Sequence, residues 1–373
     1  KIVKSWQRVI LLGFSTLFIT ACNNIISSKK AYQISDKSVA GKSSGQTVNL
    51  NSGSAEALKI QGLSLATSGK YKEAYIFLDK ALALDSKFIF DWKKIGLKLK
   101  NREDYELSVK YLKKAVDTSP NQADAWFYLG HSFAMLGEYE DALASYDKAI
   151  ELAPDNVNVL INRGISLNRL GQYEDALISY DKVIELDSDN FNAWGNRGNS
   201  LDKLGKYEDA LASHDKAIEL DPNNFNAWGN RGNSLNKLGE YEDALASHDK
   251  AIELNPNYTK AWSNRGNSLH GLGRYEDALA SYGKAIELDP NYTHAWSNRS
   301  NSLHELGRHE DALASCDKAI ELDSDNAKAW NNRAISLQEL GRDRDALASY
   351  NKAIELNPNY DLAILNRGKL LAK

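Results

Sequence analysis

Side-chain amides are the most regular chemical feature of this sequence. Asparagine recurs every 34 residues in seven consecutive copies of one pattern, and four of these copies carry another asparagine three residues later. An amide offers two N–H donors and one acceptor oxygen, which suits hydrogen bonding to an extended peptide backbone whatever its side chains. We call this set the Asn ladder and predict that it binds peptides; its members are Asn162, Asn196, Asn199, Asn230, Asn233, Asn264, Asn267, Asn298, Asn301, Asn332 and Asn366.

A second interpretation of the Asn ladder stays open. Recent duplication would also have copied one solvated polar face into every unit, asparagines included. Asparagine is a mediocre helix former, so its repetition at one place calls for an explanation. One such hydrogen bond contributes only about 0.5–1.5 kcal/mol. The two interpretations therefore differ in what the loss of several adjacent amides does to binding.

Histidine and cysteine recur without the spacing of a metal site. His214, His248 and Cys316 occupy a place that is Tyr or Leu in other units, which indicates packing residues. Three further histidines fall on adjacent units, and packed helices lie about 10 Å apart, which exceeds the reach of zinc ligands at about 2 Å each. These three are His270, His294 and His304. We predict no metal and no cofactor.

Catalytic signatures are missing from the sequence. It contains no Gly-rich phosphate loop after a strand, no nucleophile elbow and no His-Glu-x-x-His motif. A column of arginines is expected to pair with Asp and Glu of adjacent units; it comprises Arg163, Arg197, Arg231, Arg265, Arg299, Arg333 and Arg367. We therefore expect neither an enzyme nor a small-molecule substrate.

A 34-residue unit must position these residues. Nine copies fill residues 55–360 and a tenth begins at Asp361. A fixed period of this length decides the fold class before any local feature. With Phe191 as place one, place four is mostly Trp, place eight mostly Gly and place eleven Leu or Phe, which is the spacing of one helical face. Places six and nine, which hold the Asn ladder, fall on another stripe of this first helix.

A second helix is expected from Tyr207 in the reference unit. Gly205 ends the first helix, and Glu208 and Asp209 favour the start of the second. All six prolines lie at place thirty-two, where they end the second helix. The predicted units are 55–88, 89–122, 123–156, 157–190, 191–224, 225–258, 259–292, 293–326 and 327–360, followed by a terminal first-type helix over 361–373.

These landmarks resemble the tetratricopeptide repeat. The resemblance implies an all-α, right-handed α-solenoid whose first helices line the concave side, and a protein-interaction scaffold. The Asn ladder is similar to that of the repeat region of the O-linked N-acetylglucosamine transferase, where it implies backbone recognition of extended substrates. A carboxylate clamp of this family is matched only in part, by Lys260, Lys328, Asn233 and Asn264.

The N-terminus resembles a bacterial lipoprotein. Basic residues precede the apolar run 9–19, which is too short to cross a bilayer and is typical of a signal peptide. The run ends Ile-Thr-Ala-Cys, similar to a lipobox, which implies cleavage after residue 21 and lipidation of Cys22; Asn23 implies the periplasmic side of the outer membrane. An ordinary signal peptide and an uncleaved anchor remain alternatives. Residues 22–54 are polar and predict a flexible tether.

The net charge of the repeats limits the kinds of partner that the chain can bind. The first 54 residues carry a net charge of +6 and the whole chain carries −4, so the repeats carry a net charge of −10. An acidic surface argues against binding of nucleic acid. We expect a lipid-anchored scaffold of the cell envelope that binds extended peptides. The alternative is an assembly lipoprotein that uses its convex face or C-terminal end, where Leu362 and Leu365 would permit self-association.

Overall fold

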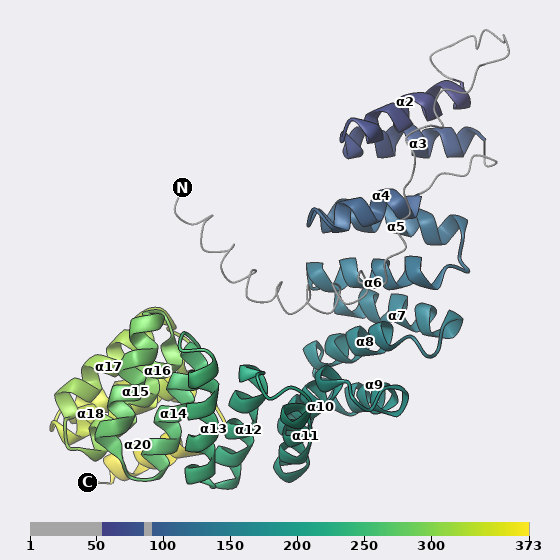
Figure 1. The fold of residues 1–373 in the computed structure, drawn as a ribbon. Helices are drawn as coiled ribbons and strands as arrows, with labels where there is room; N and C mark the ends of the chain where they lie inside the picture. Colours follow the sequence, from purple (N-terminus) through teal and green to yellow (C-terminus); the bar gives the residue numbers. More distant parts are fainter. Residues whose placement is uncertain (1–53, 86–91, 373) are drawn as a thin grey trace. The chain divides into compact units, whose positions relative to one another are not determined.

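The computed structural model describes residues 54–85 and 92–372 (Figure 1). By its contacts the chain divides into residues 1–57 and residues 58–373, and the second part is described by itself below. The described residues form nineteen helices and no strand: α2 (Ala55–Thr67), α3 (Tyr71–Leu84), α4 (Trp92–Lys100), α5 (Tyr105–Thr118), α6 (Ala123–Leu136), α7 (Tyr139–Leu152), α8 (Val157–Arg169), α9 (Tyr173–Leu186), α10 (Phe191–Lys203), α11 (Tyr207–Leu220), α12 (Phe225–Leu238), α13 (Tyr241–Leu254), α14 (Thr259–Gly271), α15 (Tyr275–Leu288), α16 (Thr293–Glu305), α17 (His309–Leu322), α18 (Ala327–Glu339), α19 (Asp343–Leu356) and α20 (Asp361–Leu371).

The helices form consecutive helix–turn–helix pairs, which confirms the predicted all-α fold class. From α4 on, each first helix packs against its own second helix, and that second helix packs against the first helix of the next unit. Each first helix from α4 through α16 also contacts the first helix of the next unit. Among the described second helices, only α3 and α5 contact each other to the same extent. The first helices therefore occupy the inner side of the stack.

Glycine and proline end the helices where the sequence predicts. Gly205 and Gly239 follow first helices with φ of 74° and 83°, a left-handed conformation that costs glycine little. Pro222 lies two residues beyond the end of α11 at Leu220. In this unit a left-handed glycine therefore ends the first helix, and a proline that cannot continue the second helix lies just beyond its end.

The core of the stack is built from small residues and from larger side chains at places eleven and twenty-four, such as Leu201 and His214. Ala210 and Ala217 of α11 are 0% and 1% exposed, and Leu201 of α10 is 3% exposed. A Cβ on Gly198 would meet Cε1 of His214 at 2.5 Å, so glycine at place eight is what lets the two helices approach. Small residues therefore allow the close packing of the two helices.

The tryptophans lie at the edge of this core. Trp92 is 1% exposed, but the other tryptophans of place four are only partly buried. Trp228 Nε1 donates to the carbonyl of Pro222 at 2.9 Å, which ties the first helix to the turn that precedes it. The indole thus fastens successive units together as well as burying apolar surface.

Candidate functional site

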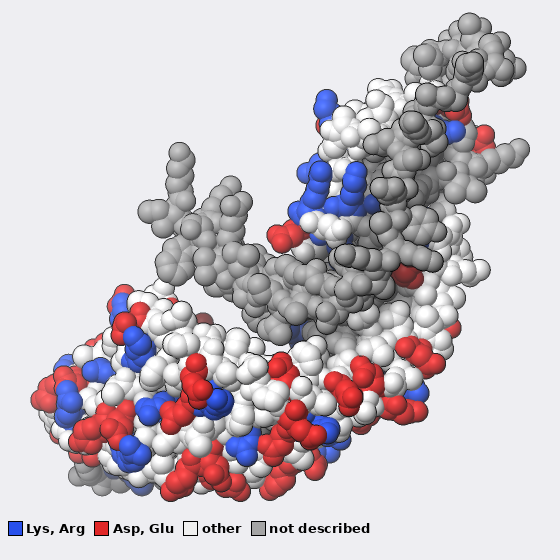
Figure 2. Space-filling view, in the orientation of Figure 1, with Lys and Arg blue, Asp and Glu red and all other residues white. Residues whose placement is uncertain are grey.

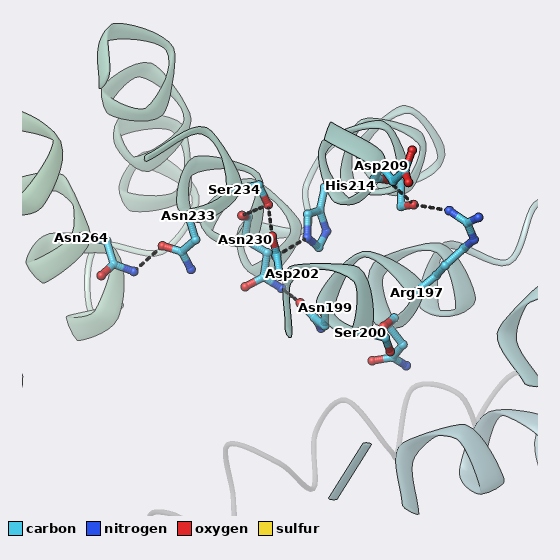
Figure 3. A network of polar contacts seen from close by, with 12 residues as sticks. Arg197, Asn199, Ser200, Asp202, Asp209, His214, Asn230, Asn233, Ser234 and Asn264 are labelled. Atoms are coloured by element: carbon cyan, nitrogen blue, oxygen red, sulfur yellow. Dashed lines mark hydrogen bonds and ion pairs between the residues drawn. The ribbon is translucent and has the colours of Figure 1, made fainter. Parts of the chain in front are cut away.

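The Asn ladder is joined by hydrogen bonds between neighbouring first helices. Asn230 Nδ2 donates to Asn199 Oδ1 at 2.8 Å, and Asn264 Nδ2 donates to Asn233 Oδ1 at 2.7 Å (Figure 3). The same pairing joins Asn298 to Asn267 at 2.9 Å and Asn332 to Asn301 at 2.6 Å. In each pair the amide at place six donates to the amide at place nine of the preceding unit. The structure therefore brings eight of the eleven predicted residues together in four pairs.

Three members of the Asn ladder stand outside these pairs. Asn162 Nδ2 donates to the carbonyl of Asn158 in its own helix at 2.8 Å. Asn196 and Asn366 have no side-chain hydrogen bond within the described part of the chain. For both, the preceding place nine is isoleucine, Ile165 and Ile335, which offers no acceptor.

A second polar network lies behind the Asn ladder, and sequence reasoning missed it. His214 Nε2 donates to Asp202 Oδ2 at 3.1 Å, and Ser234 of the next unit donates to Asp202 Oδ1 at 2.7 Å (Figure 3). The next unit repeats this arrangement with His248 and Asn236. The signal in the sequence was a polar residue at place twelve of units four to eight, each followed by serine at place ten of the next unit. The network fixes the axial register of adjacent units.

The arginine column is structural, as predicted. Arg197 Nε donates to Asp181 Oδ1 on the preceding second helix at 2.7 Å, while its Nη1 donates to Ser213 of its own second helix at 2.7 Å. Its guanidinium carbon lies 5.9 Å from the ring centre of Trp194. Two arginines lack the aspartate: at Arg299 Gly283 replaces it and only the serine bond remains, and Arg367 donates to Asn351 Oδ1 at 3.0 Å instead.

A pocket of about 270 Å³ opens on the inner side of α8 and α10. It includes two residues of the Asn ladder, at the point where the row of amide pairs begins. Its lining consists of Ile165, Asn168, Arg169, Tyr173, Asn196, Asn199 and Lys203.

Lys328 of α18 bonds one member of the Asn ladder. Lys328 Nζ donates to Asn298 Oδ1 at 2.9 Å. Burial lowers the pKa of Lys328, and the charge of Lys237, three units earlier, lowers it further. Figure 2 shows a further group of lysines over α4 and mixed charges over the later helices.

The buried histidines and the cysteine are packing residues, as predicted. His214, His248 and Cys316 are 0% exposed, and burial raises the pKa of the Cys316 thiol to about 12. Within residues 54–85 and 92–372 no three His, Cys, Asp or Glu side chains come close enough to hold a metal ion. None of the described helices is long and apolar enough to span a bilayer. Cys22, the predicted signal peptide and the tether lie outside the described residues.

Known structures share this architecture. A tetratricopeptide repeat protein from Parabacteroides merdae ATCC 43184 is 21% identical over 67% of this chain and 99% of its own, with a TM-score of 0.58. The APC/C hetero-tetramer Cut9-Hcn1 matches 85% of this chain and 76% of its own at 13% identity, also with a TM-score of 0.58. YrrB, described as a TPR protein with an unusual peptide-binding site, matches 51% of this chain and 97% of its own at 27% identity, with a TM-score of 0.39.

Family profiles cover most of the repeats, although no curated protein matches the chain. Profiles described as Tetratricopeptide repeat match residues 123–156, 191–224, 225–258, 259–292 and 327–360, and residues 145–178 and 281–314. A profile described as TPR repeat matches residues 166–205 and 300–341. Together these matches run from residue 123 to residue 360 without a gap, and the chain belongs to the tetratricopeptide repeat family.

Proposed function

We propose that this protein-interaction scaffold holds extended segments of partner proteins along the Asn ladder. The observation that carries the proposal is the pairing of its amides. Asn230 and Asn199 use one N–H and one oxygen on each other, whereas Asn264, Asn298 and Asn332 also bond other side chains. An amide can form four hydrogen bonds. The pair of Asn230 and Asn199 therefore retains donors and an acceptor for a ligand, and Asn233 and Asn301 each retain their N–H donors.

The spacing of the pairs matches an extended chain. Packed helices lie about 10 Å apart, and an extended strand advances about 3.3 Å per residue. One amide pair thus meets about every third residue of a segment that follows the groove. Because backbone groups recur in any sequence, such a row recognises extended conformation more than side-chain identity.

The pairing also holds the amides ready for a ligand. Asn264 and Asn233 fix one another at 2.7 Å between two packed helices. A side chain that is already ordered loses less conformational entropy when it binds. The bonds within the ladder are therefore compatible with binding, and they lower its entropic cost.

We further propose that a lipid on Cys22 anchors the scaffold in the bacterial cell envelope, on the periplasmic side of the outer membrane. The support is the lipobox-like sequence before Cys22 and the polar residues 22–54 that follow. The chain acts there by binding and positioning proteins, without catalysis.

A second candidate function is assembly through the C-terminal end. Leu362, Leu365 and Leu371 of α20 are 49%, 54% and 65% exposed. Apolar side chains this exposed on one short helix favour a contact with another protein or another copy of this chain.

Photocrosslinking separates these two functions. A photoreactive residue at Asn230 reports on the Asn ladder, and one at Ala246, exposed on α13, reports on the outer face. A third, at Leu365, reports on the C-terminal end. In intact cells we expect partner crosslinks from Asn230. Crosslinks from Ala246 or Leu365 alone would refute the groove and favour the assembly function.

A further inference from the structure

The last described helix, α20, leaves one apolar side open to solvent. Leu371, at place eleven, is 65% exposed, whereas its counterparts Leu167 and Leu337 are 3% and 0% exposed. Each counterpart packs against an alanine and a tyrosine of the second helix of its own unit. α20 packs against α19, and no other described helix contacts it to a comparable extent. Its open side is therefore the one that other first helices turn toward their second helix.

Gly368 lies at the centre of this open side. A Cβ on the equivalent Gly164 would meet Cε1 of Tyr180 at 2.6 Å, because the tyrosine of the second helix lies directly over that glycine. A Cβ on Gly368 would have no neighbour within 4 Å. Place eight of α20 therefore has room for one large side chain that the described part of the chain does not supply.

Arg367 lacks a hydrogen bond that its counterparts form. In six units the arginine at place seven donates through Nη1 to a serine of its own second helix, as Arg163 does to Ser179 at 2.8 Å. Nη1 of Arg367 donates to Asn351 of the preceding helix instead, at 3.0 Å. A helix on the open side would restore the usual bond if it carried a serine directly before its large side chain.

The pair of α8 and α9 shows which helix fits. Like α20, α8 has aliphatic residues at places four and five, followed by Asn-Arg-Gly. The face that α9 buries contains Ala176, Ser179, Tyr180 and Val183. These residues follow the spacing i, i+3, i+4 and i+7, which is that of an amphipathic helix docked on a partner. The matching pattern is Ala-x-x-Ser-Tyr-x-x-Val.

An apolar outer side is not what the last helix of a solenoid needs for solubility. Terminal units usually present a polar outer face, but Ile364 and Leu371 of α20 are 38% and 65% exposed. Exposed apolar surface bordered by polar residues marks interaction sites. Here it occurs at the places that form an interface between helices in every preceding unit from α4 on.

We propose that the open side of α20 binds an amphipathic helix of a partner protein, which packs there as a second helix would. This helix is the partner required by the second candidate function, on which the inference rests. Its tyrosine would lie over Gly368 and contact Leu371, and its serine would accept a hydrogen bond from Arg367. The interaction does not involve the Asn ladder.

A synthetic copy of α9 tests the inference on the full chain. The probe comprises residues 173–186, carries a fluorescent label and is held helical by a hydrocarbon staple between positions 178 and 182. Ile178 is 65% exposed, so the staple lies away from the binding face. We expect saturable binding by fluorescence anisotropy, with a dissociation constant in the micromolar range. Tyr180→Ala in the probe should weaken binding about tenfold or more.

Two variants of α20 locate the site. Gly368→Leu has space in the free protein but occupies the position of the probe's tyrosine. Leu371→Asp places a charge against the apolar side of the probe. Each should weaken binding about tenfold or more. Leu362→Asp makes the same change on another side of α20 and is the matched control, which should alter the affinity by no more than about twofold.

The outcomes separate this inference from the second candidate function. No binding of the probe by the wild type, or equal affinity of the wild type and Gly368→Leu, would overturn the inference. Crosslinks from Leu365 in intact cells would then still support assembly through the C-terminal end, and their absence would refute both. Dimerisation of the wild type in sedimentation velocity, abolished by Leu371→Asp, would place a second copy of the chain on α20 and would also overturn the inference.

Discussion

Asn230 Nδ2 donates to Oδ1 of Asn199, 2.8 Å away on the preceding first helix. This bond joins two neighbouring units, and it also fixes which atoms of each amide remain for a ligand. A substitution in the Asn ladder therefore changes the stability of the array and the affinity for a ligand by different amounts.

Alanine at three adjacent amide pairs should abolish peptide binding. Asn233, Asn267 and Asn301 each accept a bond from the next unit, and removing all three breaks three adjacent pairs. We expect one substitution to change affinity less than tenfold, because one bond contributes about 0.5–1.5 kcal/mol, whereas the triple variant loses binding by fluorescence anisotropy.

The matched control replaces three exposed turn asparagines, Asn223, Asn257 and Asn291, with alanine. It should bind like the wild type. A triple ladder variant that stays folded by circular dichroism and keeps its affinity would favour the other interpretation, in which duplication copied a solvated face.

The repeat period predicted the backbone and the contacts that depend on residue type alone. Gly205, Pro222 and the pairing of Arg197 with an aspartate follow from one unit read against the next. The bond between Asn230 and Asn199 could not be predicted from the sequence. It depends on the side-chain rotamers and on the register of two helices, and it joins residues 31 positions apart in the chain. Ile165, by contrast, was a readable signal, since it interrupts the asparagines of place nine.

Lowering the pH should destabilise the array through His248. Burial lowers the pKa of His248 to about 3, from an ordinary value of 6.5. Below pH 6.5 the unfolded chain binds a proton that the folded chain binds only near pH 3, so this contribution to stability is complete above pH 6.5 and is lost as the pH falls. From pH 7 to pH 5 we expect a loss of about 2 kcal/mol in the free energy of unfolding.

Urea unfolding of the His248→Tyr variant at both pH values isolates this contribution. Tyrosine occupies the same place in other units, where Tyr180 bonds Asn168 at 3.2 Å. The variant should show a pH dependence smaller by about the same 2 kcal/mol. Parallel curves for the two proteins would mean that His248 accepts a proton without cost in the folded state.

Serine in place of Cys22 should release the protein from the membrane. A thioether-linked lipid needs the cysteine sulfur, and the serine variant lacks it. We expect loss of label from a radioactive fatty acid and a shift of the protein to the soluble fraction. The control is Cys316→Ala, whose cysteine is fully buried in α17. Label that persists in the Cys22 variant, or disappears in the control, would exclude this anchor.

Aspartate in place of Gly283 should stabilise the array. Arg231, Arg265 and Arg333 each bond an aspartate on the preceding second helix at 2.6 Å, but Arg299 meets Gly283 at this place. A Cβ at Gly283 would have no neighbour within 4 Å, so a side chain fits there. Burial also lowers the pKa of Arg299, and a carboxylate would oppose that effect.

Comparison with Gly283→Asn separates the charge from the helix propensity, since both variants remove the glycine. The known aspartate partners are about half exposed, so the ion pair itself should add about 0.5–1 kcal/mol. We therefore expect Gly283→Asp to unfold at higher urea concentration than Gly283→Asn, with the difference reduced by salt. In an Arg299→Met background the two variants should unfold together. An equal stability of the two in the presence of Arg299 would show that its guanidinium gains nothing from a carboxylate at this place.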